Sequence, residues 1–255
     1  GIFDSGVGGT SIWKAIHKLL PNEQTIYLAD SINAPYGEKT KDEILELSIK
    51  NTELLRSKNC KLIVVACNTA TTNAINFLRA NYMVPFIGIE PAIKPAALQT
   101  NTKKVGVLAT KGTLSSSLFH STSKLYAEGI EVIEQEGQGL VELIEAGKID
   151  SQEMKALLRI YLEPMLEANI DCLVLGCTHY PYLIETLRGL LPNTIKIIDS
   201  GEAVAKQTKA VLEKHGICNL DSKVPQANVF YSNGDITVLK ELIVMGNHKV
   251  KYLDF

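Results

Sequence analysis

The chain of 255 residues is 45% hydrophobic and 21% charged, and it carries a net charge of −2 at pH 7. This composition is typical of a globular protein with a substantial core, and the length suffices for two lobes of ordinary size. Because positive charge is not in excess, nucleic acid is not an expected partner. No apolar run approaches the roughly 20 residues that span a bilayer, so a membrane is not expected either.

The first part of the chain alternates between strands and helices, with turns between them. Because helices separate the successive strands, we expect a parallel sheet. The predicted elements are a strand at 1–3, a glycine-rich turn at 4–9, a helix at 10–20, a strand at 25–29, a loop at 33–37, a helix at 41–58, a strand at 62–66, a helix at 71–81 and a strand at 84–89.

The same pattern then starts again, which indicates an ancient duplication. The predicted elements are a strand at 104–109, a turn at 110–113, a helix at 115–128, a strand at 131–134, helices at 139–146 and 151–167, a strand at 173–176, a helix after Pro181, a strand at 195–198, a helix at 202–215, a strand at 229–232 and a helix at 236–245.

We therefore predict an α/β protein of two pseudo-symmetric lobes, each a mostly parallel sheet flanked by helices, with the active site in the cleft between them. The last strand and helix are too small to stand alone, so we expect them to return to the first lobe. That lobe then comprises 1–92 and 205–255, and the second lobe comprises 93–204.

The chain has five cysteines, an odd number without close clustering. This argues against a disulfide framework and fits a reducing cytoplasm. No Cys-x-x-Cys pair occurs, so no metal site is expected. We interpret Cys60, Cys172 and Cys218 as small hydrophobic residues, as free cysteines most often are.

Cys67 and Cys177 differ from the other three in their surroundings. Each ends a continuous apolar run, the pattern of a buried parallel strand, and each is followed by a predicted helix whose free N–H groups stabilise a thiolate. Carboxyl ends of parallel strands are where open α/β sheets place their chemistry. The two halves of the chain thus supply one functional thiol each.

Two thiols on opposite sides of a cleft suit the inversion of a carbon that carries one hydrogen. One group removes the proton from one face and the other delivers a proton to the opposite face. A cysteine, with an unperturbed pKa of about 8.5, is near enough to operating pH to serve in either form.

Other polar residues lie beside these strand ends. Asp4 and Ser5 form a turn that caps a helix, and Asp4 can also bind an ammonium group or assist the nearby thiol. His179 is the one histidine of the five in a plausible site. The loop with Tyr36 and Gly37 is either a simple turn or a ligand contact. The turn at 4–9 lacks the third glycine of G-x-G-x-x-G, so nicotinamide binding is rejected.

Four motifs in order along the chain resemble those of bacterial glutamate racemase, in the aspartate/glutamate racemase superfamily: Asp4-Ser5-Gly6-Val7-Gly8-Gly9, Pro35-Tyr36-Gly37, Ala66-Cys67-Asn68-Thr69-Ala70 and Gly176-Cys177-Thr178-His179-Tyr180-Pro181. The resemblance implies a cytoplasmic, cofactor-independent enzyme that interconverts L- and D-glutamate and supplies D-glutamate for peptidoglycan. Homodimers are common in this family, so a homodimer is an expectation as well.

The resemblance also implies roles for single residues. Cys67 and Cys177 would be the acid/base thiols, supported by Asp4 and by His179 with Glu145. Glu145 is assigned although the chain has Glu142-Leu143-Ile144-Glu145-Ala146 where many relatives have Pro-Leu-Val-Glu-Glu. The substrate-binding residues would be Asp4, Ser5, Tyr36, Gly37, Asn68, Thr69, Thr178 and His179, with Thr110 and Thr113 as further candidates for carboxylate contacts.

Three alternatives stay open. An aspartate racemase would share both thiols, and a two-lobed amino-acid-binding module would share the fold without the chemistry. A cysteine-dependent hydrolase would use Cys177 with His179. Because these two residues flank one position at a strand end, we expect their side chains to point apart, which argues against the hydrolase.

Overall fold

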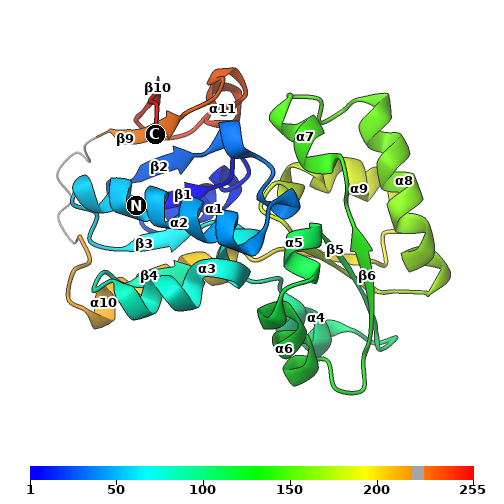
Figure 1. Ribbon diagram of the computed structural model, residues 1–255. Helices are drawn as coiled ribbons and strands as arrows, with labels where there is room; N and C mark the ends of the chain where they lie inside the picture. Colours follow the sequence, from blue (N-terminus) through cyan, green and yellow to red (C-terminus); the bar gives the residue numbers. More distant parts are fainter. Residues whose placement is uncertain (220–226) are drawn as a thin grey trace.

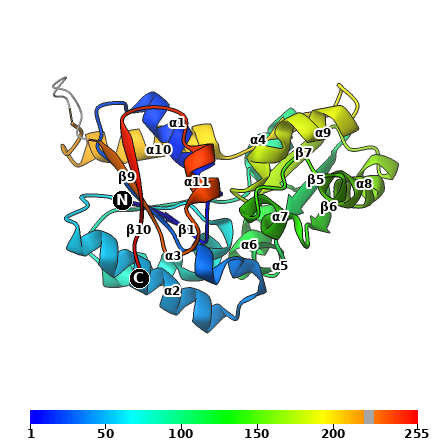
Figure 2. The same cartoon turned by 90° about the horizontal axis from the view of Figure 1, so that it is seen from above.

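The computed structural model describes residues 1–219 and 227–255. Two lobes lie side by side, each built on one sheet, and both chain termini lie in the same lobe (Figure 1). Figure 2 shows the same two bodies from above, with β9 and β10 in the lobe that holds the N-terminus. In the described part of the chain, none of the helices has the length and apolar character needed to cross a membrane.

The first lobe contains a six-stranded sheet in which all pairs are parallel, in the order β10-β9-β2-β1-β3-β4. Its strands are β1 (Ile2–Asp4), β2 (Ile26–Ala29), β3 (Ile63–Val65), β4 (Phe86–Gly88), β9 (Asn228–Ser232) and β10 (His248–Tyr252). Its helices are α1 (Thr10–Leu19), η1 (Ser31–Asn33), η2 (Tyr36–Glu38), α2 (Lys41–Ser57), α3 (Asn68–Asn81), α10 (Gly201–Lys214) and α11 (Thr237–Leu242), where η marks a 3-10 helix.

Alternating side chains of this sheet supply two separate cores. Ile2 and Val64 belong to the cluster that contains α1 and α10 residues, whereas Phe3 and Val65 belong to the cluster that contains α2 and α3 residues. Helices on both faces explain why the central strands are apolar throughout rather than alternating. The covered sheet leaves its carboxyl edge as the place where polar residues can gather.

The second lobe contains a parallel four-stranded sheet in the order β6-β5-β7-β8. Its strands are β5 (Lys104–Ala109), β6 (Glu131–Glu136), β7 (Cys172–Gly176) and β8 (Lys196–Ile198). Its helices are α4 (Ile93–Gln99), α5 (Lys111–Leu114), α6 (Ser117–Tyr126), α7 (Leu140–Glu145), α8 (Gln152–Glu167), η3 (Tyr180–Leu183) and α9 (Ile184–Leu190). Residues of α4 and α6 form one core with this sheet, and residues of α7, α8 and α9 form the other.

The predicted fold class, two parallel sheets flanked by helices, is confirmed. Several details differ. Helix α4 lies where no element is predicted, and the short helix α5 overlaps the predicted turn at 110–113. The helix predicted at 115–128 begins at Ser117, because the Ser116 side chain accepts the Phe119 N–H and caps α6. The edge strand β10 escaped prediction because its sequence alternates lysines with few apolar residues, as suits an edge.

The chain crosses between the lobes twice, once between β4 and α4 and once between β8 and α10. The Ser200 hydroxyl donates to the Glu90 carbonyl oxygen at 2.6 Å and ties the two crossings together. All of α10 packs along α1, so the predicted lobe boundary at 204/205 lies inside this helix. The exact division of the chain into lobes stays a prediction.

Candidate functional site

A small cavity lies where the carboxyl ends of β1 and β3 face the carboxyl end of β7. Its volume of about 10 Å³ is room for about one water molecule. We call it the interlobe cavity. Its lining comprises Ser5, Pro35, Tyr36, Gly37, Cys67, Asn68, Thr69, Thr110, Val141, Cys177, Thr178 and His179. Both predicted thiols therefore face one site, one from each lobe.

Cys67 is the N-cap residue of α3 and lies two residues after the end of β3. Its sulfur accepts the Ala70 N–H at 3.4 Å, and its thiol lies 3.8 Å from the Ser5 hydroxyl. Burial raises the pKa of this thiol well above its usual value and the Asp4 charge adds to the rise, while the Ala70 N–H opposes it. In the free site, then, Cys67 is a protonated thiol, only 5% exposed.

Cys177 follows β7 directly and has a different partner. Its sulfur lies 3.7 Å from Nδ1 of His179. The prediction that these two side chains point apart is therefore wrong. The chain leaves the strand at Gly176 and turns, with the Tyr180 N–H bonded to the Cys177 carbonyl, so the alternation of a strand no longer applies.

His179 connects this thiol to a carboxylate. Its Nε2 lies 2.5 Å from Oε1 of Glu145, at the end of α7. Burial by itself lowers the pKa of the imidazole, but the hydrogen bonds with Cys177 and Glu145 raise it well above its usual value. A protonated imidazolium donates from both nitrogens, to the sulfur and to the carboxylate. The pair therefore places a positive charge beside the Cys177 sulfur.

Asp4, at the end of β1, is fully buried and joins the two lobes. It accepts the N–H groups of Gly6 and Gly9 at 3.3 and 2.9 Å, and the Thr178 hydroxyl of the second lobe donates to it at 3.2 Å. Burial raises the pKa of Asp4 to about 6, against the opposing influence of the His179 charge. Asp4 acts on Cys67 through its charge, because the hydrogen bonds of its carboxylate go to these three groups.

The glycine-rich turn after β1 receives side chains from the opposite lobe. A Cβ atom at Gly6 would overlap Glu145, and one at Gly8 would overlap His179. The Val7 N–H donates to Glu145 Oε1 at 2.6 Å. The turn therefore leaves room for the His179–Glu145 pair.

The Tyr36 loop is anchored by a hydrogen bond to the buried Asp30 carboxylate. The Tyr36 hydroxyl donates to Asp30 at 2.5 Å and lies 3.1 Å from the Asn51 amide nitrogen, so it points away from the interlobe cavity. The Asp30 carboxylate also accepts hydrogen bonds from the side chains of Asn33 and Asn233. Sequence reasoning missed Asp30, although it directly follows a buried strand just as Asp4 does.

Hydroxyl and amide groups complete the lining. Thr69 Oγ1 lies 2.8 Å from Thr110 Oγ1 and 3.3 Å from Thr113 Oγ1, which joins the lobes through three hydroxyls. Thr113 belongs to this cluster but does not line the cavity. Asn68 lines it, and both polar atoms of its buried amide lack a hydrogen-bond partner. A buried amide without partners at a cavity wall is a group prepared for a ligand.

The structure adds three residues to the predicted site. Pro35 and Val141 line the cavity and supply apolar surface. The Ser31 hydroxyl donates to Oε2 of Glu145 at 3.2 Å from the first lobe. Pro35 belongs to the Pro35-Tyr36-Gly37 motif but is not among the predicted site residues. No local pattern singles out Val141 or Ser31, because each gains its place only when the lobes meet. Within residues 1–219 and 227–255, no cluster of three or more His, Cys, Asp or Glu side chains could hold a metal ion.

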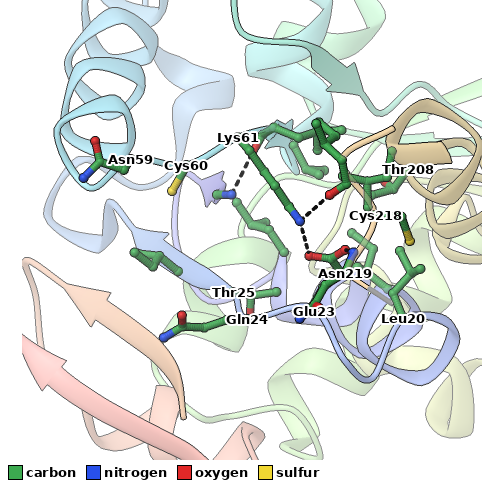
Figure 3. Close-up of a pocket in the computed structure, with 18 of the residues that line it drawn as sticks. Leu20, Glu23, Gln24, Thr25, Asn59, Cys60, Lys61, Thr208, Cys218 and Asn219 are labelled. Carbon is green, nitrogen blue, oxygen red and sulfur yellow. Dashed lines mark hydrogen bonds and ion pairs between the residues drawn. The ribbon is translucent and has the colours of Figure 1, made fainter. Parts of the chain in front are cut away.

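A larger cavity of about 550 Å³ lies at the opposite end of the first sheet (Figure 3). Its wall contains the ion pair of Lys61 with Glu23 at 2.8 Å, and Lys61 also donates to the Ile217 carbonyl. Cys60 and Cys218 line it and are absent from the interlobe cavity, which lies at the other edge of the sheet. Lys58, which also lines the cavity, lies over the Tyr231 ring, and the Gly1 ammonium donates to the Leu62 carbonyl oxygen.

Comparison with known proteins relates the whole chain to one group. The family model for Asp/Glu/Hydantoin racemase matches residues 8–208. The glutamate racemase of Ectopseudomonas mendocina (strain ymp) is 45% identical over 244 residues, which cover 95% of this chain and 92% of the relative.

Solved structures agree with this result. A glutamate racemase isoform from Bacillus anthracis superposes with a TM-score of 0.88 at 28% identity, over 100% of this chain and 96% of that chain. The Escherichia coli glutamate racemase, in complex with L-glutamate and the activator UDP-MurNAc-Ala, superposes with a TM-score of 0.86 at 34% identity, over 99% and 97% of the two chains. The similarity therefore extends over both lobes.

Proposed function

Because the chain belongs to the Asp/Glu/Hydantoin racemase family and within it to the glutamate racemases, we propose that Cys67 and Cys177 interconvert L- and D-glutamate by a two-thiol proton transfer. The observation that carries this proposal is the placement of one thiol from each lobe on one cavity, each with its own polar partners. Two monoprotic groups on opposite faces of one carbon are what stereochemical inversion needs.

In one direction, the Cys177 thiolate takes the Cα proton and the Cys67 thiol delivers its proton to the opposite face. The reverse direction exchanges the roles, and neither direction has a net change in protons. The His179 imidazolium stabilises the Cys177 thiolate, and the α3 N-terminus with Ser5 receives the developing thiolate of Cys67. The carbanion forms in a closed cavity that excludes water.

Fixed polar groups around the thiols suit an amino acid with two carboxylates. The buried Asn68 amide and the hydroxyls of Thr69 and Thr110 offer donors, and Asp4 offers a negative charge for the ammonium group. Tyr36 and Gly37 contribute through the loop that they form, since the Tyr36 hydroxyl is bound to Asp30. Ser5 and Thr178 lie beside the two thiols, and Thr113 supports Thr69.

The wider role follows from the product. D-glutamate made by this reaction would serve peptidoglycan synthesis in the cytoplasm, and we propose a homodimer as its assembly. Size-exclusion chromatography with light scattering tests the assembly: a mass near twice the 27.9 kDa of one chain supports a dimer.

The test of the reaction is L-glutamate in deuterium oxide without added cofactor, followed by circular dichroism and proton NMR. We expect the optical signal to decay, and the D-glutamate formed early to carry deuterium at Cα while the remaining L-glutamate keeps its proton. Retention of the substrate proton in the product would contradict two separate thiols. The same behaviour with aspartate but not glutamate would overturn the substrate.

Serine variants locate the thiols. Cys67→Ser and Cys177→Ser should each lower racemisation in both directions by about a thousandfold or more, because a hydroxyl is a far weaker acid than a thiol. Cys60→Ser, at the other edge of the sheet, is the matched control and should retain activity. A Cys67→Ser variant that retains full racemisation would contradict the two-thiol mechanism.

A further inference from the structure

Gly112, in the short helix α5 of the second lobe, touches the first lobe without a side chain. A Cβ atom at this position would lie 2.7 Å from Cγ2 of Thr69 and 3.1 Å from Cα of Gly37, both across the cleft. The φ angle of Gly112 is not positive, so the backbone itself does not require glycine here. What requires glycine is the approach of the two lobes.

The contact is reciprocal. A Cβ atom at Gly37 would lie 2.8 Å from Cβ of Thr110. The Asn73 amide nitrogen lies 3.3 Å from the Gly112 carbonyl oxygen, and the hydroxyls of Thr69 and Thr110 meet at 2.8 Å. We call these five residues, Gly37, Thr69, Asn73, Thr110 and Gly112, the closure seam. It borders the interlobe cavity, because Gly37, Thr69 and Thr110 also line that cavity.

The seam cannot stay shut through a catalytic cycle. The cavity of about 10 Å³ holds about one water molecule, whereas an amino acid with two carboxylates is several times larger. Substrate therefore enters and leaves when the lobes separate, and the chemistry follows when they approach again. The closest approach is limited by the atoms that meet at the seam.

We propose that Gly112 is a positioning residue whose missing side chain sets how closely the two lobes, and with them the two thiols, approach each other. This inference rests on the proposed racemisation, since it assigns the seam to the geometry of that reaction. A methyl group at Gly112 would meet Thr69 and the Gly37 backbone before the hydroxyl cluster forms. Misplacement of reacting groups by about 1 Å can cost about a hundredfold in rate.

The test compares Gly112→Ala with a matched control, Gly189→Ala. Gly189 lies in α9, and a Cβ atom there would meet nothing within 4 Å. Both variants gain helix propensity equally. We expect Gly112→Ala to lower kcat by about a hundredfold with a smaller change in KM, and Gly189→Ala to match the wild type. Equal kinetics of both variants would overturn the inference.

A rescue identifies the obstructing atom. Thr69→Ser removes Cγ2 and keeps the hydroxyl, so the double variant Gly112→Ala/Thr69→Ser should recover kcat toward that of Thr69→Ser alone. A purely local disturbance of α5 would be insensitive to the residue at Thr69. If Gly112→Ala fails to fold, the double variant is compared with Thr69→Ser instead. A kcat about a hundredfold below that of Thr69→Ser would then contradict the inference, because the clash with Cγ2 has been removed.

Thiol labelling gives a readout that needs no activity. Cys67 and Cys177 are 5% and 7% exposed, and Cys60 and Cys218 in the cavity of Figure 3 provide internal references in the same chain. With iodoacetamide and peptide mass spectrometry, we expect Gly112→Ala to raise the labelling rates of Cys67 and Cys177 several-fold and to leave Cys60 and Cys218 unchanged. Unchanged labelling rates at Cys67 and Cys177 would contradict the proposal that Gly112 sets the approach of the lobes. The two proposals can fail separately. If the wild type does not racemise glutamate, but Gly112→Ala still raises the labelling rates of Cys67 and Cys177 alone, the proposed function is overturned and the role of the seam stands.

Discussion

At the scale of single residues, the two thiols of the site reach their working state by different means. Cys67 has a helix N–H and a hydroxyl as its partners and is kept protonated by burial, while Cys177 has an imidazolium beside it. The two thiols therefore lie in different electrostatic surroundings, and only Cys177 has a cationic side chain as its neighbour. Asp4 contributes to this difference because its charge acts on Cys67 and is countered by His179.

Asp4→Asn tests this electrostatic role. The native pKa of about 6 exceeds the usual 3.8, so ionisation destabilises the fold: stability is lost as pH rises from about 4 to 6 and stays lower above that range. The variant removes this penalty and should be more stable by about 3 kcal/mol at pH 8 and by about half as much at pH 5. Urea unfolding at both pH values measures the difference.

The same variant should lose activity, and the acidic limb near pH 6 in the wild-type profile of kcat/KM should disappear with it. A gain in stability that is equal at both pH values would contradict the raised pKa.

At the scale of elements, the site is built from strand ends rather than from any one helix or loop. Asp4 ends β1, Asp30 follows β2, and Cys67 follows β3, so parallel register brings their side chains to one edge. The loop after β2 carries Tyr36 over this edge and is anchored there by its hydroxyl. The position of the Tyr36 loop therefore depends on the buried Asp30 carboxylate.

Tyr36→Phe removes that anchor and leaves the ring in place. Because the buried Asp30 carboxylate then loses one of its donors, we expect a loss of about 1–3 kcal/mol in the free energy of unfolding, together with a higher KM from a looser loop. Tyr126→Phe is the control, since that ring lies partly exposed beneath Lys94 and needs no hydroxyl for this contact. An equal effect of the two substitutions on urea unfolding would refute the anchor.

At the scale of the whole molecule, the interlobe cavity is closed around about one water, and the lobes are tied at several places. Glu145 reaches the Val7 backbone and Ser31, Thr178 reaches Asp4, and Ser11 donates to the Thr178 carbonyl oxygen. Binding of a substrate must separate these groups and then re-form them around the ligand. Ligand affinity and fold stability are therefore linked.

Thermal unfolding of the inactive Cys67→Ser variant measures this linkage without turnover. Glutamate at about one hundred times its dissociation constant should stabilise the fold by about 2.7 kcal/mol, which corresponds to a rise of about 5–10 °C in Tm for a chain of this size. Aspartate at the same concentration should give a smaller rise in Tm, because its side chain is one methylene shorter than that of glutamate. An equal shift with both amino acids would leave the choice of glutamate unsupported.

The fold class, the parallel sheets and the position of Cys67 and Cys177 near strand ends could be predicted from the sequence, because apolar runs that end in polar residues indicate where strands end. The contact of Cys177 with His179 was decided only by the turn after β7, and local alternation predicted the opposite. Asp30, Ser31 and the closure seam also depended on the tertiary structure. Ser31 and the seam residues have their partners across the cleft, and Asp30 binds Asn233 far along the chain. Contacts at such separations leave no periodic signal in the sequence. The order of residues along the chain sets which residues end a strand. The packing of the two lobes sets which side chains those residues contact.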